Sequence, residues 1–560
     1  MDLERNNLSG AGSTYLRQHA ANPIHWQEWG PDIQAHARSL RRPLFVSVGY
    51  SSCHWCHVMA AEAFSDADTA AFLNGHFICI KVDREERPDI DHYLMGFLVE
   101  RTGSGGWPLN VFLTHDMTPV YGLTYAPCAR DRGMPTLLEI AEAVQAFLAS
   151  GREVPAFTPA RRMPSPFPSG HIVPALTRTF DREHGGFGSS PKFPPHSTLL
   201  YLLYRLSEEE DSVAKEMALR TLDAMRLGGL NDHLGGGVFR YCVDRRWTIP
   251  HFEKMLYDQA MALWVFALAF RVLGRDVDRA MAFKIVSCLQ ADFRRDGLYL
   301  NSHDADTVHV EGATYLWERN ELETLLGPAG FAAFSEVYDI PEGGNFHGKI
   351  HLVRRADTPC GELEAALLDA RRKRLQPNAD TKVVSGINAL AVCALVQASR
   401  FLGAPELRDA ASVNMRRLIE TFWKEGRLAR AMSDGNVRRH SFLFDASAAL
   451  LALTMLAEDD GSWSGVLAEA ASYVESFRDA DGWVESREPD FIPVPASRYD
   501  QPIPSSPSLA TLGLARRDLL AGKAPSPIEY GEPHEADFHN LAAMLCDGRC
   551  RLLRPKTPSP

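Results

Sequence analysis

The sequence lacks features that would place the protein in several special classes. Its 560 residues contain no uninterrupted run of about 18 apolar residues, the length that a membrane-spanning helix needs. Ten cysteines are too few to cross-link a secreted scaffold of this size. The formal net charge of −12 argues against nonspecific binding to nucleic acid or to anionic membranes. We therefore expect neither a membrane nor a nucleic acid among the partners.

The first residues also lack the apolar core of a secretory signal. Met1–Arg5 reads Met-Asp-Leu-Glu-Arg, which is charged rather than apolar. With so few cysteines, this predicts a reducing, cytoplasmic compartment, where a lone pair of thiols serves chemistry rather than structure. The composition, 45% hydrophobic and 23% charged, is that of a globular protein, and the length predicts two or more domains.

The most informative stretch that is present is Cys53-His54-Trp55-Cys56-His57. The apolar run Pro43–Tyr50 before it predicts a buried strand, and Val58–Leu73 after it has helical periodicity. The cysteines thus fall at a strand-to-helix turn, where free backbone N–H groups and the helix dipole favour the thiolate. We expect Cys53, nearer the turn and more exposed, to be the attacking thiol, and Cys56, one turn into the helix, to be the resolving thiol.

The motif has three other interpretations. The same letters spell the CxxCH attachment signature of c-type haem, which needs export and an axial ligand. Zinc binding lacks a second CxxC or HxxxH pair to complete a tetrahedral site. A pair of buried, unreactive thiols is the third interpretation. Thiol–disulfide chemistry is favoured over all three, and we expect neither a cofactor nor a metal.

Residues 1–150 predict a thioredoxin-like α/β domain. Predicted strands at 44–48, 77–82, 109–113 and 119–122 alternate with the CxxC turn and helices in the thioredoxin order. Trp107-Pro108 is a candidate cis peptide opposite the dithiol. Asp83 or Glu62 is a candidate proton shuttle to the resolving cysteine. The alternative for Asp83 is that its charged loop, 83–89, is a solvated, salt-linked turn.

A Pro-rich linker at 151–170 separates this domain from a helical domain at 171–521, and a Pro-rich tail follows at 522–560. The paired helices and long loops of the second domain predict an α/α toroid. Helices are predicted near 172–180, 196–207, 211–228, 253–273, 276–293, 316–327, 362–374, 386–402, 406–423, 442–457, 463–478 and 506–521.

A stretch of the helical domain combines aromatic and titratable residues, as carbohydrate sites do. His251 and Glu253 are the leading candidates for acid–base chemistry there. The other candidates are Asp232, His233, Trp247, Asp258, Asp304 and Asp306. The alternative is that these residues cap helices and hold loops without catalysing a reaction.

On these motifs the chain resembles the thioredoxin-domain proteins related to spermatogenesis-associated protein 20. The matching segments are 22–23, 49–59, 81–89, 105–109, 124–125, 187–188, 191–193, 235–237, 250–258 and 344–346. The resemblance implies a thioredoxin-like domain fused to an (α/α)6 toroid of the six-hairpin glycosidase type, similar also to N-acylglucosamine 2-epimerases.

The chain departs from that family pattern at three places. Ser385–Ala389 stands where relatives tend to have Thr-Ser-Trp-Asn-Gly, Asp445-Ala446 replaces an Asp-Tyr pair, and Pro504–Ser508 replaces Pro-Ser-Gly-Asn-Ser. Several of the groups that are lost are of the kind that line a sugar pocket. The departures argue against carbohydrate turnover and leave the dithiol intact.

The sequence thus supports three hypotheses. The first is a thiol–disulfide oxidoreductase that acts on a disulfide-containing protein or a small-molecule thiol, with the toroid recognising the substrate. The second is a carbohydrate-active toroid, epimerase-like or hydrolase-like, with a regulatory thioredoxin-like domain and a carbohydrate ligand. The third is a scaffold of two binding modules without activity.

Overall fold

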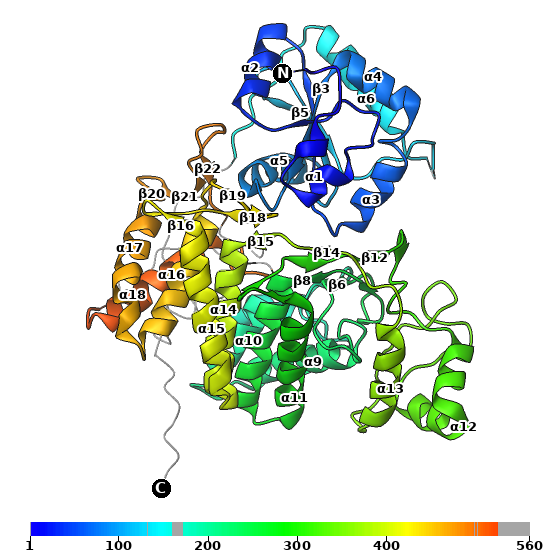
Figure 1. Ribbon diagram of the computed structural model, residues 1–560, viewed down its shortest axis with the longest axis vertical. Coiled ribbons are helices and arrows are strands. Elements are labelled where there is room, and N and C mark those ends of the chain that lie inside the picture. The colour runs from blue at the N-terminus through cyan, green and yellow to red at the C-terminus, as the bar shows by residue number, and fades with distance from the viewer. Residues whose placement is uncertain (1, 132, 160–171, 498, 501, 525–560) are drawn as a thin grey trace.

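The computed structural model describes residues 2–131, 133–159, 172–497, 499–500 and 502–524 (Figure 1). Helix α6 ends at Ala149 and α7 begins at Ile172, on either side of the predicted linker. Residues 160–170 of that linker and the predicted tail from residue 525 onward lie outside the described residues. The predicted domain boundaries therefore stay predictions.

The first domain is built around a five-stranded sheet with the order β1-β3-β2-β4-β5. Strand β2 (Leu44–Gly49) pairs in parallel with β3 (Ile78–Asp83) and antiparallel with β4 (Leu109–Leu113). The edges are β1 (Gln27–Glu28) and β5 (Pro119–Leu123). Every residue of β2, β3 and β4 is buried, which explains their continuous apolar runs. The four predicted strands and the thioredoxin-like order are confirmed.

Helices cover both faces of this sheet. Helices α3 (His54–Ala61), α4 (Ala67–His76) and α6 (Leu137–Ala149) pack with Phe45 and Phe112 on one face. The opposite face is covered by α2 (Pro31–Leu40) and α5 (Pro88–Thr102). The CxxC turn, between β2 and α3, is therefore fixed by a strand and a helix that are both packed into the core.

The second domain is helical. Its helices are α7 (Ile172–Thr179), α8 (His196–Leu206), α9 (Ser212–Leu227), α10 (Leu256–Leu273), α11 (Asp276–Cys288), α12 (Arg319–Val337), α13 (Gly361–Arg372), α14 (Ser385–Leu402), α15 (Pro405–Phe422), α16 (Leu443–Ala457), α17 (Ser464–Glu475) and α18 (Ser506–Leu520). Each corresponds to a predicted helix.

Two of the differences between predicted and observed helix bounds have a local cause. The helix expected from residue 253 begins at Leu256, because Pro250–His251 and Lys254–Met255 form the short strands β7 and β8. The helix expected to end at 327 continues as α12 to Val337, with a break at Gly327, whose φ is 66°. Glycine adopts this left-handed backbone at little cost, and Pro328 then restarts the helix.

The helices form the hairpins of an (α/α)6 toroid, as predicted. Successive inner helices α8, α10, α14, α16 and α18 pack against one another, and α9, α11, α15 and α17 pack outside them. The α12–α13 hairpin lies to one side of this ring (Figure 1). Inner helices α10 and α14 are long and apolar enough to cross a membrane, but 72% and 94% of their apolar windows are buried. Their place in the toroid core accounts for that composition.

The first domain lies over one end of the toroid (Figure 1). Short strands and loops form this end, and a two-residue strand carries no periodicity by which a sequence could reveal it. The strands are β6 (Tyr241–Cys242), β7, β8, β11 (Ser302–His303), β12 (Asp306–Thr307), β13 (Val310–Glu311), β14 (Ala379–Asp380), β15 (Val383–Val384) and β18 (Ala431–Ser433).

Candidate functional site

The two cysteines of the CxxC motif form a disulfide at the start of α3. Cys53 is the N-cap residue, and its Sγ accepts a hydrogen bond from the backbone N–H of Cys56 at 3.2 Å. The two Cα atoms are 5.2 Å apart. The Cys53 sulfur thus accepts a hydrogen bond from a backbone N–H that has no partner within the helix. This hydrogen bond and the helix dipole stabilise a thiolate at Cys53.

Both cysteines are buried, so the expected difference in exposure between them is small. Cys53 is 2% exposed and Cys56 1%. The helical domain covers the turn: the Ser52 hydroxyl lies 3.4 Å from the Met255 sulfur. Within the motif, Trp55 alone is an exposed side chain, at 46%. A substrate disulfide of protein size therefore reaches Cys53 only if the two domains separate locally.

Glu253, a candidate from the toroid, lies directly above this turn. Both of its carboxylate oxygens accept hydrogen bonds from the Tyr50 hydroxyl, at 3.0 and 3.2 Å. Arg240 donates to the same carboxylate at 2.9 Å and also contacts the Tyr50 hydroxyl. Burial raises the pKa of Glu253 to about 8, although the charge of Arg240 opposes this. The structure thus brings together two sites that the sequence predicted separately.

The two histidines of the motif face the loop that leads into β12. His54 Nδ1 lies 2.8 Å from Asp306 Oδ1, and His57 Nδ1 lies 3.3 Å from Asp306 Oδ2 and 3.7 Å from Asp304 Oδ1. Burial lowers the pKa of His57, but the hydrogen bond that its ring donates to Asp306 and the charge of Asp304 outweigh burial and raise the pKa to about 9. Burial raises the pKa of Asp304 to about 6.

His251, the second leading toroid candidate, extends this arrangement. Its Nδ1 lies 3.3 Å from Glu311 Oε1 and 3.9 Å from Glu253 Oε1. Its ring centroid is 5.8 Å from that of His54. Burial lowers the pKa of His251 to about 3, so this imidazole is neutral. We call the following residues the histidine cluster: His54, His57, His251, Asp304, Asp306 and Glu311.

Trp107-Pro108, the predicted cis peptide, is cis. The Trp107 ring centroid is 6.0 Å from that of Tyr50, and its indole N–H donates to Asp91 at 2.7 Å. The Arg84 guanidinium lies over the same ring, at 3.9 Å. Trp107 is thereby held beside the strand end that carries the CxxC turn.

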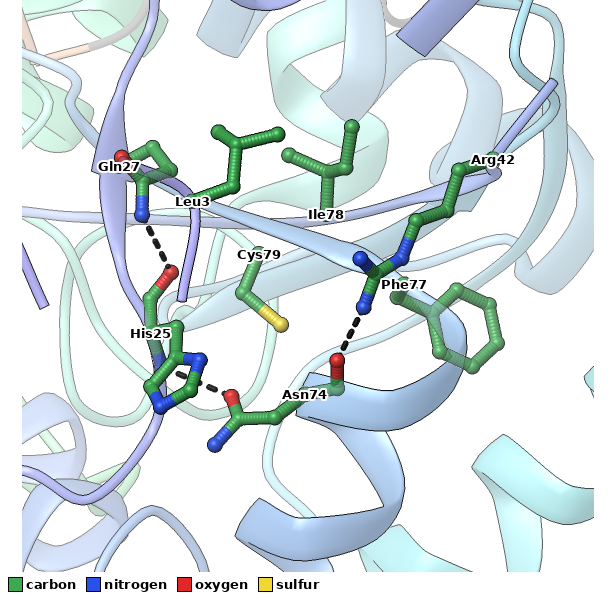
Figure 2. Close-up of a pocket in the computed structure, with 8 residues that line it drawn as sticks. All are labelled: Leu3, His25, Gln27, Arg42, Asn74, Phe77, Ile78 and Cys79. Atoms are coloured by element: carbon green, nitrogen blue, oxygen red, sulfur yellow. Dashed lines mark hydrogen bonds between the residues drawn. The ribbon is translucent and has the colours of Figure 1, made fainter. Parts of the chain in front are cut away.

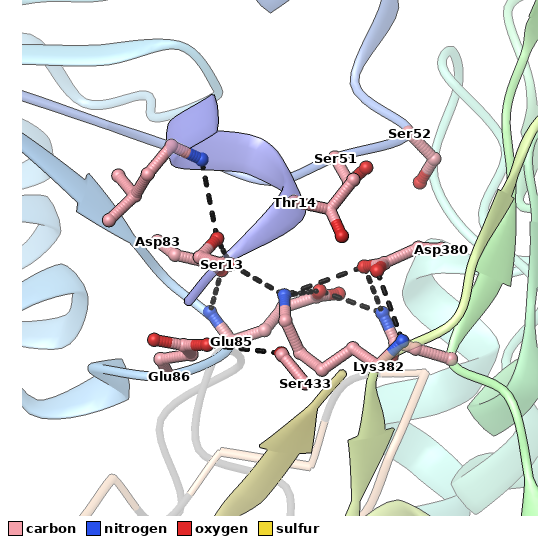
Figure 3. Close-up of polar contacts among 12 residues, drawn as sticks. Ser13, Thr14, Ser51, Ser52, Asp83, Glu85, Glu86, Asp380, Lys382 and Ser433 are labelled. Carbon is pink, nitrogen blue, oxygen red and sulfur yellow. Dashed lines mark hydrogen bonds and ion pairs between the residues drawn. The ribbon is translucent and has the colours of Figure 1, made fainter. Parts of the chain in front are cut away.

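Asp83 lies at the end of β3, in a second buried cluster between the domains. Lys382 of the helical domain donates to Asp83 at 2.5 Å and to Glu85 at 3.1 Å, and lies 3.4 Å from Asp380 (Figure 3). Ser13 also donates to Asp83, at 2.5 Å. We call Asp83, Glu85, Asp380 and Lys382 the Lys382 cluster. Glu62, the other proton-shuttle candidate, is exposed and accepts from Tyr125 at 2.7 Å.

The carboxylate of Asp232 is held inside the toroid rather than in the interface. Lys254 donates a hydrogen bond to it at 2.6 Å. Both terminal nitrogens of Arg371 also donate hydrogen bonds to it, at 2.7 and 2.8 Å. Burial opposes ionisation, but Arg371 and Lys254 hold the pKa of Asp232 well below its ordinary value. His233 beside it bonds to the Gly228 carbonyl at 3.0 Å. Both line a cavity with room for about one water molecule.

The remaining toroid candidates also have internal contacts. Trp247 is buried and its indole N–H donates to the Gly185 carbonyl at 3.3 Å. Asp258, at the start of α10, lies 3.7 Å from His196 of α8, and both side chains are fully buried. Asp445, one of the departures from the family pattern, accepts from the Gly386 N–H at 2.9 Å and pairs with Arg430 at 2.8 Å.

A second small cavity lies in the first domain, near the β1 edge of its sheet (Figure 2). It also has room for about one water molecule. The Cys79 thiol points into it, and burial raises the pKa of Cys79 to about 12. At that pKa the thiol is inert. Cys242, Cys288 and Cys393 are likewise buried, in the helical domain.

The interface contains residues that the sequence did not single out. Tyr50, Arg240 and Glu311 complete the contacts around the dithiol, and Lys382 completes the second cluster. Nothing local distinguishes Glu311 or Lys382, because each also contacts the other domain: Glu311 contacts His54, and Lys382 contacts Asp83 and Glu85.

Residues 5–158 match the model of a thioredoxin-like DsbH family, described as a protein of unknown function, DUF255. The uncharacterized protein B0495.5 of Caenorhabditis elegans is 36% identical over 461 residues, which cover 70% of this chain and 62% of the worm protein. Spermatogenesis-associated protein 20 of Rattus norvegicus is 34% identical over 468 residues, covering 72% of this chain and 59% of the rat protein. The chain thus spans about three fifths of the length of these curated relatives.

Solved structures are similar at much lower identity. A sugar epimerase from a ruminal bacterium is 13% identical, with a TM-score of 0.32, and the match covers 67% of this chain and 96% of the epimerase. A DsbH oxidoreductase is 17% identical, with a TM-score of 0.18, covering 23% of this chain and 88% of the oxidoreductase. By sequence the chain is therefore similar to the thioredoxin-like DsbH family over residues 5–158 and to spermatogenesis-associated protein 20 over 468 residues, and in its structure a thioredoxin-like domain precedes an α/α toroid.

Proposed function

We propose that the protein is a thiol–disulfide oxidoreductase that works through Cys53 and Cys56, and that the helical domain selects its substrate. The observation that carries the proposal is the position of Cys53 as the N-cap of α3, within disulfide distance of Cys56. A sulfur at this position becomes a stabilised thiolate, and the thiolate is the attacking species. The substrate is a disulfide-containing protein or a small-molecule disulfide in a reducing, cytoplasmic compartment.

The reaction proceeds in two exchanges. The Cys53 thiolate attacks one sulfur of the substrate disulfide, so that a mixed disulfide forms and the other substrate sulfur leaves as a thiolate. The Cys56 thiolate then attacks Cys53 Sγ, which releases the second substrate thiolate and closes the Cys53–Cys56 disulfide. The substrate gains two electrons and the protein loses two. A dithiol reductant restores the protein.

Trapping of the mixed disulfide tests this proposal. Cys56→Ser should accumulate a mixed disulfide with a fluorogenic disulfide substrate, whereas Cys53→Ser should neither react nor trap. Cys128→Ser is the matched control, since Cys128 is an exposed cysteine outside the motif, and it should keep the full rate. An unchanged rate in Cys53→Ser, or no turnover by the natural chain, refutes the proposal and leaves the two-module scaffold as the better interpretation.

A second candidate, carbohydrate chemistry at His251 and Glu253, is supported by the raised pKa of Glu253. A carboxyl group that holds its proton near neutral pH is suited to general acid catalysis. Since Tyr50 caps this carboxyl, a sugar reaches it only after the domains separate. Incubation with a panel of N-acyl sugars and disaccharides tests it: turnover that Glu253→Gln removes supports the candidate, and no turnover across the panel refutes it.

A further inference from the structure

Within the histidine cluster, three ligand atoms from the two domains converge on one point. The ligand atoms of His57, Asp304 and Asp306 all lie within 4.8 Å of one another. His57 comes from α3 of the first domain, whereas Asp306 begins β12 of the toroid and Asp304 lies in the loop just before it. Both aspartates are buried, with exposures of 6% each. His57 is partly buried, so the three ligand atoms are largely shielded from bulk water.

The hydrogen bonds outside this trio fix its orientation. His57 Nε2 lies 2.8 Å from the Ser51 carbonyl oxygen, which only accepts, so Nε2 carries a hydrogen and Nδ1 faces the two carboxylates. Asp306 is held through its other oxygen by His54 Nδ1, at 2.8 Å. Metal-binding histidines are held in this way, with the second ring nitrogen donating to a carbonyl group.

A second observation is a buried ring nitrogen without a hydrogen bond in the same histidine cluster. His251 is 4% exposed, and its Nδ1 makes no hydrogen bond to any described residue. It faces Glu311 at 3.3 Å, and Glu311 lies 3.9 Å from His54 Nε2. Three carboxylates thus face three imidazoles, none of which carries a permanent charge. Either protons or a cation must occupy the space between them.

We propose that His57, Asp304 and Asp306 bind a divalent transition-metal ion, of the Mn²⁺ or Zn²⁺ class, across the domain interface. Imidazole and carboxylate ligands suit these ions, and three protein ligands leave room for water in the remaining positions. The ion takes the place of the proton that otherwise lies between His57 Nδ1 and the carboxylates. This metal site differs from the sequence-based expectation that the protein binds no metal. The proposal does not depend on the redox activity proposed above.

At this position, a bound ion would link the two domains next to the disulfide. His57 directly follows Cys56, and both aspartates belong to the domain that covers the disulfide. An ion bound to all three groups holds the domains together over Cys53. We therefore expect the bound ion to slow attack on the disulfide by an external reductant.

The test uses the oxidised full-length chain, in which both thiols are blocked by the disulfide. Mn²⁺ binding is followed by loss of the free-ion signal in electron paramagnetic resonance, and Zn²⁺ binding by competition with Mn²⁺. We expect one ion per chain, and at least tenfold weaker binding in both Asp304→Asn and His57→Gln. His115→Gln is the matched control, because His115 also lies beside an aspartate, at 3.1 Å, but at a surface site. It should bind as the natural chain does.

Two further measurements separate the outcomes. Mn²⁺ should raise the Tm of the natural chain by several degrees and should slow reduction of the disulfide by a phosphine at least threefold; neither effect should occur in His57→Gln. The double variant Cys53→Ser/Cys56→Ser should keep its affinity. The proposal is overturned if the oxidised chain binds no ion, if Asp304→Asn and His57→Gln bind as well as His115→Gln, or if the double cysteine variant loses the ion.

Discussion

On the two sides of the domain interface, carboxylates are balanced by different kinds of group. In the Lys382 cluster, one ammonium of fully buried Lys382 is shared by three carboxylates, and surrounding charges raise the pKa of Lys382 well above its ordinary value despite burial. In the histidine cluster, the partners are imidazoles, which exchange a proton or bind a metal. The charges of the Lys382 cluster are therefore constant near neutral pH, whereas those of the histidine cluster can change.

The largest expected effect is on the fixed side. Lys382→Met removes the cation and leaves Asp83, Glu85 and Asp380 as buried carboxylates without their shared partner. Breaking a buried ion pair from one side costs about 3–5 kcal/mol, so chemical denaturation should give a much lower free energy of unfolding. Lys215→Met, at an exposed position of α9, should change it by less than about 0.5 kcal/mol. If the two variants have similar free energies of unfolding, the Lys382 cluster does not hold the domains in the fixed way described above.

A second substitution tests the packing under the dithiol. A Cβ at Gly49 would lie 2.7 Å from Cys56 Sγ and closer still to the Tyr15 hydroxyl, and overpacking of this kind costs about 1–3 kcal/mol. We expect Gly49→Ala to lower the free energy of unfolding by about 2 kcal/mol. Gly75→Ala in α4, where a Cβ meets nothing within 4 Å, should be neutral or slightly stabilising. If the two variants melt alike, the turn is more adaptable than its contacts indicate.

The surplus of negative charge beside the Lys382 cluster should appear as a pH dependence. Burial, and then the charge of Asp83, raises the pKa of Glu86 to about 7, while Lys382 and Arg438 oppose the shift. The folded state therefore binds this proton more tightly than the unfolded state, and stability from this group is lost as the pH rises from about 4.5 to about 7.

Glu86→Gln cannot undergo this loss. Compared with the natural chain, the variant should gain about 1–2 kcal/mol above pH 7 and nothing near pH 4.5, as measured by urea denaturation across that range. Glu142→Gln, on an exposed position of α6, should show no such gain. A gain that is independent of pH would mean that packing, rather than ionisation, distinguishes Glu86.

The smallest expected effect is on the side that covers the dithiol. Tyr50→Phe removes the hydroxyl that donates to Glu253, although Arg240 still pairs with this carboxylate. We expect a loss of about 1 kcal/mol and a severalfold faster reduction of the Cys53–Cys56 disulfide, because this hydrogen bond joins the domains. Tyr121→Phe, on a ring that is 44% exposed, is the control. An unchanged reduction rate would mean that Tyr50 does not limit access.

Local patterns were enough to predict the elements of the fold. The apolar run of β2, the helical periodicity of α14 and the Trp107-Pro108 dipeptide each carry their signal within a few residues. The short strands at the end of the toroid carry no such signal. The bounds of α10 were misjudged for this reason, since β7 and β8 precede it.

The relation between the two candidate sites could not be predicted in the same way. Tyr50 and Glu253 are 203 positions apart in the chain, and Asp83 and Lys382 are 299 apart. The sequence around each of these residues indicates only the domain to which the residue belongs. The sequence therefore predicted two separate sites, one at the dithiol and one in the toroid. The burial of Cys53 follows from that contact, and a pattern within one domain contains no information about it.

The fluorescence of Trp55 should report whether the two cysteines of the motif are oxidised or reduced. A disulfide accepts an electron from an excited indole and quenches its emission, and Trp55 lies between the two cysteines in the chain with its ring 46% in solvent. The difference in emission between the natural chain and Trp55→Phe isolates this indole from the nine other tryptophans among the ten. Opening and closing of the sulfur–sulfur bond can thus be followed in real time, without a label and without a known substrate.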